Sequence, residues 1–136
     1  MILVNVHWSK TKDLNTYLYT HVCMKFVLTK KDIVALNQEI EDGSLHNEAS
    51  LDFALGYARR TENWTKALAY LVRAILLDHV FVEGNKRTSA LLIKAYIKYE
   101  GYDAYNDRIV KMIKQILLKN ITSIRGIEEM IKDVIK

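Results

Sequence analysis

Proline is absent from this chain of 136 residues, glycine occurs five times and cysteine only once. The single cysteine, Cys23, excludes an internal disulfide, and its apolar neighbours indicate a small core residue rather than a nucleophile. With so little proline and glycine, the chain contains no low-complexity linker, and we expect one domain. The abundance of Ile, Leu, Lys and Glu then favours an all-α fold with short connections.

Long hydrophobic runs are missing as well. No apolar stretch reaches the length that spans a membrane. The opening run from Met1 to Val4 is too short for a secretory signal, and no charged segment precedes it. The unpaired cysteine fits a reducing compartment. We therefore expect a cytoplasmic protein without a membrane partner.

Several sequence signatures of catalysis and metal binding do not occur. The chain has neither a P-loop nor a glycine-rich kinase loop, and its four histidines lack the spacing of a zinc site. A Ser-His-Asp or Cys-His triad has no support beyond the presence of these residue types. The net charge of +4 is spread over most segments, which indicates a solvated surface rather than a nucleic-acid interface.

Residues 1–27 form an extension whose structure the sequence leaves ambiguous. The composition of Met1 to Val6 favours a strand, whereas Asp13 to Cys23 fits both helical spacing and strand alternation. Residues 28–136 are expected to form a single domain of about six helices, which begin near positions 30, 47, 63, 85, 106 and 123.

Helical periodicity is clearest in the third of these helices. Five aliphatic residues recur there at positions i, i+3, i+4, i+7 and i+8: Leu68, Leu71, Val72, Ile75 and Leu76. This stripe predicts a central, buried helix that ends next to His79. The first helix is expected to follow a capping box at Thr29–Asp32 and to end before Gly43. Gly101 is expected just past the end of the fourth.

The segment from His79 to Thr88 differs in composition from the helices on either side. It places an imidazole, a carboxylate, a glycine, a carboxamide and two cations in one short stretch. A helix that begins near Asn85 directs its unpaired N–H groups and its positive dipole end towards this loop, which favours a bound anion. Gly84 allows the backbone to approach a phosphate closely.

The side chains of this segment suit nucleotide chemistry. Lys86 and Arg87 add positive charge, and arginine can bind a phosphate through two parallel hydrogen bonds. Glu83 is a hard oxygen ligand for a Mg²⁺ ion that bridges phosphates. His79 can take up a proton near neutral pH, and Phe81 is expected to anchor the loop in the core.

The segment resembles the signature of the Fic/Doc family, H-x-F-x-[D/E]-[G/A]-N-[G/K]-R, at all seven fixed positions. The similarity extends over roughly residues 28–136 and implies a Fic/Doc-like helical domain. By this resemblance, His79 is the catalytic base that deprotonates a target hydroxyl, and Glu83 holds Mg²⁺ on the nucleotide phosphates. The resemblance assigns four further residues to nucleotide and phosphate binding: Gly84, Asn85, Lys86 and Arg87.

Three positions depart from the pattern that is usual in Fic adenylyltransferases. Lys86 stands where glycine is common, Ala90 replaces a second arginine, and Val80 stands where proline is common. The first two departures resemble Doc, the death-on-curing branch, which transfers a phosphoryl group to a protein. The resemblance thus implies a transferase that uses Mg²⁺ and ATP, or another nucleoside triphosphate, to modify a Ser, Thr or Tyr hydroxyl of a target protein.

Which group is transferred stays open at this level. Phosphoryl transfer is slightly favoured over AMP transfer (adenylylation), because the bulky Lys86 and the missing second arginine suggest a different nucleotide pose. A toxin held inactive by a separate antitoxin protein is compatible with either reaction. The alternative is a non-catalytic module that binds a nucleotide or a protein. The oligomeric state is also open.

Residues 43–49 are the candidate for the flap that positions the target peptide in this family. We place the target contacts on five of them: Gly43, Ser44, Leu45, His46 and Asn47. Ser44 and Glu48 also have the spacing of an inhibitory-helix pattern found in many Fic proteins. Ala49 departs from that pattern, and its partner arginine is missing. Glu48 is therefore expected to be a simple carboxylate at a helix N-terminus.

Overall fold

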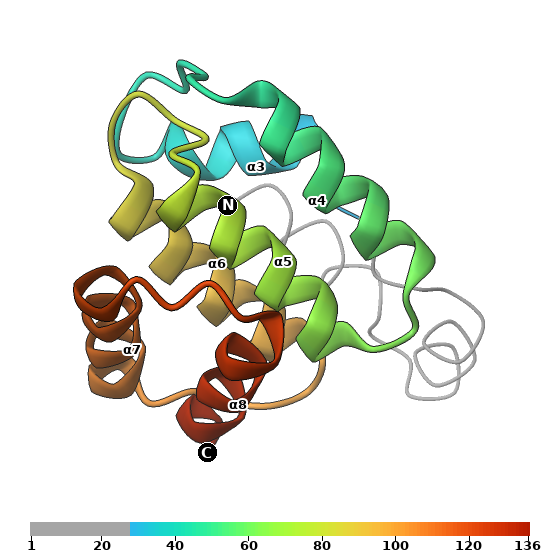
Figure 1. Cartoon of the computed structure of the whole chain (residues 1–136), viewed down its shortest axis with the longest axis vertical. Coiled ribbons are helices and arrows are strands. Elements are labelled where there is room, and N and C mark those ends of the chain that lie inside the picture. The colour runs from blue at the N-terminus through green and yellow to red at the C-terminus, as the bar shows by residue number, and fades with distance from the viewer. Residues whose placement is uncertain (1–27) are drawn as a thin grey trace, which may run out of the picture.

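The computed structural model describes residues 28–136 and contains six helices in that range (Figure 1). In chain order the helices are α3 (Lys30–Asn37), α4 (Glu48–Arg60), α5 (Trp64–Leu77), α6 (Asn85–Tyr99), α7 (Asn106–Lys119) and α8 (Ile124–Val134). The predicted all-α, single-domain architecture is thus confirmed for residues 28–136. The predicted strand at the start of the chain, the ambiguous segment that follows it and Cys23 lie outside the described residues.

Helix α5 is the central element of the domain. Nine of its fourteen residues are buried, and it packs against α4, α6 and α8. The predicted stripe from Leu68 to Leu76 lies in the core. The helix ends at Leu77, so the prediction of a buried helix that leads directly to His79 is confirmed.

The starts of several helices follow from side-chain caps. Thr29 and Asp32 form the expected reciprocal capping box. Asn47, Asn63 and Ser123 each accept a hydrogen bond from an N–H group in the first turn of the helix that follows. Such caps satisfy donors that the helix itself cannot pair.

Helix α3 is shorter than the sequence predicts. It ends at Asn37 rather than just before Gly43, and residues 38–40 form turns. The side chain of Asn37 explains the difference, because its Oδ1 atom accepts a hydrogen bond from the N–H of Gly43 at 2.9 Å and draws the chain back over the helix end. Gly43 has a φ of +80°, a left-handed conformation that favours glycine.

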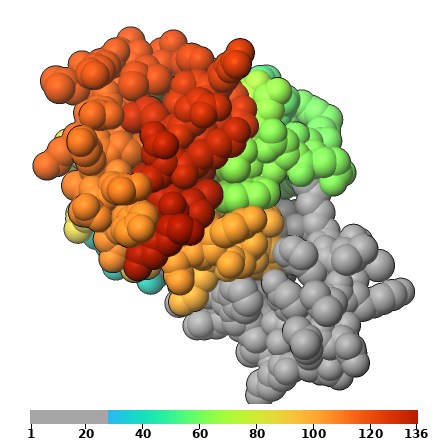
Figure 2. Space-filling view, turned by 90° about the horizontal axis from the view of Figure 1, so that it is seen from below, coloured from blue at the N-terminus to red at the C-terminus, as the bar shows by residue number. Residues whose placement is uncertain are grey.

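The helices are arranged around the α5–α6 pair. Figure 1 shows α5 and α6 in the middle, with α3 and α4 on one side and α7 and α8 on the other. Figure 2 shows the face that α7 and α8 cover, in orange to red. None of the helices in residues 28–136 combines the length and the apolar character needed to cross a membrane. The loop between α5 and α6 lies beside the end of α3. The predicted motif from His79 to Thr88 and the predicted flap, which follows α3, are therefore close together.

Candidate functional site

The loop between α5 and α6 begins with an unusual backbone conformation. His79 has a φ of 52°, directly after the helix C-cap Asp78. This left-handed region is uncommon for a residue other than glycine and ends the helix by turning the chain away. The imidazole is exposed, and no hydrogen bond within residues 28–136 holds it. None of the described residues therefore competes for the imidazole with a molecule from outside.

Asn85 closes the loop with its side chain. Its Oδ1 atom accepts a hydrogen bond from the N–H of Phe81 at 3.0 Å, and its Nδ2 atom donates to the carbonyl of the same residue at 2.9 Å. The ring of Phe81 is buried and fixes the middle of the loop. Because the carboxamide is engaged with Phe81, we expect the backbone N–H of Asn85, at the start of α6, to be its main contact with an anion.

Gly84 lies at the N-cap of α6 and has a φ of +81°. No side chain caps this helix start, so the first N–H groups of α6 lack the partner that a capping side chain supplies. A Cβ atom at Gly84 would come within 2.8 Å of Cγ of Glu41 and 3.1 Å of Nδ2 of Asn37. Both the backbone conformation and the close packing therefore require glycine here.

A pocket of about 420 Å³ opens at this helix start. His79 and Glu83 border it, and Leu76, Val82 and Leu117 provide apolar walls. The four residues predicted to bind phosphate also line it: Gly84, Asn85, Lys86 and Arg87. One pocket thus brings together the residues that the sequence assigns to catalysis, metal binding and phosphate binding.

A second depression of about 570 Å³ lies alongside, between α6 and α7. It shares Lys86, Arg87 and Leu117 with the first pocket. Most of its remaining lining is apolar, and the volume is in the range of small-molecule sites. An anionic ligand at the N-terminus of α6 therefore has apolar space next to it for an organic group.

Arg87 has a partner that the sequence does not indicate. Its Nη2 atom lies 2.9 Å from Oε1 of Glu41, in the turn that follows α3. The Arg87 side chain remains 64% exposed, so the guanidinium can reach a ligand in the pocket if it shares or leaves this ion pair. Lys86 is exposed and forms no ion pair within residues 28–136.

The candidate flap lies directly against the loop. Backbone hydrogen bonds of 2.7 to 3.1 Å join residues 44–47 to residues 80–82, and Leu45 forms an isolated antiparallel bridge with Phe81. Hydrogen bonds from Ser44 lower the pKa of the Asp42 carboxyl below its ordinary value and order the start of the flap. Gly43 therefore contacts α3, and the other four predicted flap residues, Ser44 to Asn47, contact the loop.

Asn37 is a site residue that the sequence interpretation missed. It is 1% exposed, and its Nδ2 atom donates to the carbonyl of Glu83 at 2.9 Å and to Oγ1 of Thr88 at 3.0 Å. One signal was available: Asn37 stands four residues after the core residue Ile33, so a polar side chain occupies an expected core position. The partners of that side chain lie too far along the chain for the sequence to show them.

Glu48 has the simple role that the sequence favours. It is the first residue of α4 and an acidic residue in its first turn, where a carboxylate is stabilised by the helix dipole. It forms an ion pair with Lys30, whose ammonium also lies 2.8 Å from Asp52. Among the described residues, Glu48 therefore pairs with Lys30 of α3 rather than with Arg87 of the motif.

The residues at the pocket fit a metal ion that arrives with a ligand. Within residues 28–136, no group of three or more His, Cys, Asp or Glu converges to form a metal site. Glu83 offers one exposed carboxylate at the pocket. Mg²⁺ is commonly bound through one or two carboxylates together with substrate phosphates, so Glu83 suits an ion carried on a nucleotide.

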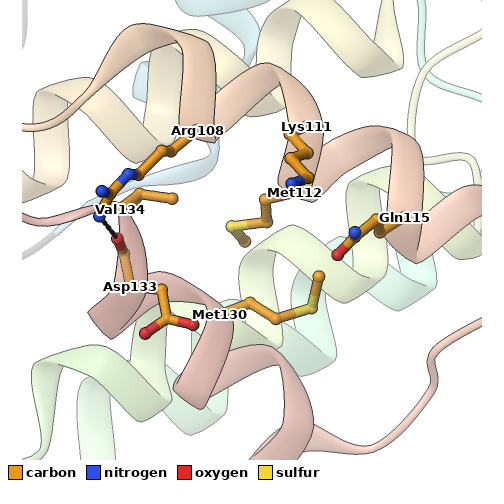
Figure 3. Close-up of a pocket in the computed structure, with 7 residues that line it drawn as sticks. All are labelled: Arg108, Lys111, Met112, Gln115, Met130, Asp133 and Val134. Carbon is orange, nitrogen blue, oxygen red and sulfur yellow. Dashed lines mark hydrogen bonds between the residues drawn. The ribbon is translucent and has the colours of Figure 1, made fainter.

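Another pocket, of about 270 Å³, lies between α7 and α8 (Figure 3). Met112 and Met130 line it, and Arg108 at its edge donates to the carbonyl of Asp133 at 3.0 Å. It shares no lining residue with the pocket at His79. Its lining includes no histidine and none of the motif residues from His79 to Arg87, so the chemistry expected from the sequence belongs to the other pocket.

Comparison of the chain with models of known protein families, with curated proteins and with solved structures finds no match in any of the three. What the pocket does must therefore be inferred from its own chemistry. That chemistry combines an exposed imidazole, an uncapped helix start, two cations and one carboxylate around a single opening.

Proposed function

We propose that this chain is a Fic/Doc-type transferase, which moves a phosphate-bearing group from a nucleoside triphosphate to a Ser, Thr or Tyr hydroxyl of a target protein. One observation carries the proposal: His79 and the N-terminus of α6, with Lys86 and Arg87, border the same pocket. Attack of a hydroxyl on phosphorus needs a base for the proton and positive groups for the charge on the phosphates.

In this reaction His79 accepts the proton as the hydroxyl oxygen forms its bond to phosphorus. The N–H groups at the start of α6 and the side chains of Lys86 and Arg87 stabilise the negative charge on the phosphoryl oxygens. Glu83 would hold Mg²⁺, which neutralises charge on the phosphates when it is bound. The bond to the leaving phosphate breaks, and a nucleoside diphosphate departs in phosphoryl transfer.

The flap supports a protein as the acceptor. Residues 44–47 pair with the loop along one edge, and an extended peptide can add to a second edge by backbone hydrogen bonds. The exposed imidazole of His79 follows in the same loop. A hydroxyl on such a peptide would then be presented to the base.

AMP transfer is the second candidate. In that reaction the α-phosphorus is attacked and pyrophosphate leaves. The apolar depression of about 570 Å³ beside Lys86 and Arg87 offers space for the nucleoside in either reaction. We favour phosphoryl transfer because Lys86 and Ala90 both resemble the Doc branch. We also propose a cytoplasmic setting and, as a compatible role, a toxin that a separate antitoxin protein restrains.

The test is a label-transfer assay with whole-cell lysate as the source of targets and ATP labelled at either the α- or the γ-phosphate. Wild-type protein is compared with His79→Ala and with Lys98→Ala, an exposed cation on α6 that borders none of the pockets described. Label from the γ-position alone, lost only in His79→Ala, supports phosphoryl transfer.

The other outcomes are equally informative. Label from the α-position alone, lost in His79→Ala, identifies AMP transfer, because the γ-phosphate then leaves with pyrophosphate. Label that persists in His79→Ala contradicts the role of the imidazole. If no triphosphate gives any label and none raises the melting temperature, the chain is not a nucleotide-dependent transferase. If a triphosphate stabilises the protein without transfer, a binding module is indicated.

A further inference from the structure

Asn37 joins three separate backbone segments through one buried side chain. Its Oδ1 atom accepts from the N–H of Gly43, the first residue of the flap. Its Nδ2 atom donates to the carbonyl of Glu83 and to the hydroxyl of Thr88. All three distances lie between 2.9 and 3.0 Å, and the residue is 1% exposed.

The two acceptors of Nδ2 bracket the proposed anion site. Glu83 and Thr88 stand immediately before and after residues 84–87, which supply the helix start and its two cations. Thr88 is fully buried, so the residue that directly follows this segment is fixed in the core. Gly84 lies close to the same carboxamide, because a Cβ atom at Gly84 would be 3.1 Å from Nδ2 of Asn37.

The chemistry of the partners fixes the orientation of the carboxamide. A backbone N–H requires the oxygen of Asn37, and a carbonyl requires its nitrogen. Exchange of the two ends would set N–H against N–H and oxygen against oxygen in two partly buried contacts, which is unfavourable. The planar group therefore behaves as a rigid connection between Gly43 and Glu83.

We infer that Asn37 is a positioning residue that couples the flap to the anion loop, so that a phosphate bound at the start of α6 also orders the flap that presents the target. This inference rests on the proposed function. The coupling acts in both directions, since a peptide that orders the flap favours the bound form of the loop by the same factor. Nucleotide and target protein thereby promote the binding of each other.

The pairing of residues 44–47 with residues 80–82 is a different connection. It holds the flap to the first half of the loop, near His79. Asn37 holds the start of the flap to the second half, where the phosphate is expected. Removal of Asn37 should therefore separate the phosphate end from the flap and leave the pairing near His79 in place.

Hydrogen exchange with inorganic tripolyphosphate as the probe tests this coupling without knowledge of the target. Exchange of the amides in residues 43–47 and 84–88 is measured with and without the probe in wild type, Asn37→Ala, Asn37→Asp and Thr88→Val. Asn37→Asp keeps the acceptor for Gly43 and loses the donor to Glu83, so it breaks the connection without a cavity. Thr88→Val is the matched control, because it removes one partner of Nδ2 and keeps the link between Gly43 and Glu83.

In wild type and Thr88→Val, the probe is expected to slow exchange in both segments, in the flap by about fivefold or more, the lower end of common coupling factors. In Asn37→Asp, and in Asn37→Ala if it folds, slowing is expected at residues 84–88 alone. A purely structural Asn37 would lower stability but leave the response of the flap intact.

Two results would overturn the inference. If the probe slows residues 84–88 in wild type but leaves the flap unchanged, or if Asn37→Asp keeps the flap response, the anion site stands and the coupling does not. If the probe slows neither segment in any variant, the proposed anion site fails and the inference fails with it.

Discussion

His79 occupies a left-handed conformation with a φ of 52°, and this provides a way to separate its chemical role from its structural one. An L-residue in that region is disfavoured by about 1–2 kcal/mol. Glycine removes this strain but raises the entropy of the unfolded chain, which offsets about 0.5–1 kcal/mol of the gain. His79→Gly should therefore raise the free energy of unfolding by about 0.5–1 kcal/mol, because the exposed imidazole gives up no hydrogen bond within the described chain.

For a domain of this size, the gain corresponds to a rise in melting temperature of about 2–5 °C. His79→Ala keeps a side chain in the left-handed region, so its stability should lie within about 0.5 kcal/mol of wild type. Urea denaturation and label transfer are measured on the same preparations. Both variants should lose transfer, although one of them is more stable than wild type. Such a combination is expected of a residue that is retained for function in a strained conformation.

Asn120 provides the matched control. Among residues 28–136, His79 and Asn120 are the two residues other than glycine with a positive φ. Asn120 has a φ of 50° and lies at the C-cap of α7. Asn120→Gly should also stabilise the fold, by a smaller amount because asparagine tolerates this conformation better, and should leave transfer intact. If His79→Gly proves less stable than wild type while Asn120→Gly behaves as expected, the imidazole makes a structural contribution and the reasoning about strain is refuted.

Three further predictions follow from contacts at the site and in the core. Glu41→Gln removes the exposed ion pair with Arg87 and should change stability by less than about 1 kcal/mol while tightening tripolyphosphate binding in titration calorimetry; unchanged binding would show that Arg87 is not held back by Glu41. Asn85→Ala leaves the buried backbone of Phe81 without both partners and should lower stability by about 2 kcal/mol in urea denaturation, and a neutral effect would contradict the described loop closure. Burial raises the pKa of the Tyr96 phenol above its ordinary value of 10.0, so the folded state resists ionisation. The free energy of unfolding should therefore fall as the pH rises above 10.0. Denaturation measured across alkaline pH should show a weaker dependence in Tyr96→Phe.

Local patterns in the sequence were sufficient for most of the helices. The stripe from Leu68 to Leu76 identified α5 and its burial, since a helix repeats its buried face every three to four residues. Asn63 and Ser123 marked helix starts because their side chains cap donors two or three residues away. Gly101 was expected just beyond α6 and has a φ of +94°. Each of these features depends on neighbours within one or two turns.

The site was predictable only in part, and the reason is sequence distance. The motif from His79 to Arg87 is continuous, so its side chains could be named directly. Asn37 and Glu41 contact that motif from about 46 positions earlier, and no local pattern shows such a contact. The early end of α3 is a different case, because it is set by the hydrogen bond from the N–H of Gly43 to Oδ1 of Asn37, only six positions away.

From the long separation between Asn37 and its partners, we expect these contacts to form late when the domain folds. The contacts with Glu83 and Thr88 close loops of 46 and 51 residues, and loop closure of this length is entropically unfavourable until neighbouring elements have formed. Helices α4 and α5 can pair earlier, because they are adjacent along the chain and pack against each other. We therefore expect residues 83–88 to gain the support of Asn37 only when α3 docks onto α6, and to lose it when α3 detaches. We expect a partially opened form of the domain, with α3 detached, to keep its α4–α5 core and every residue of the motif, and yet to lack the contacts by which Asn37 holds residues 83–88.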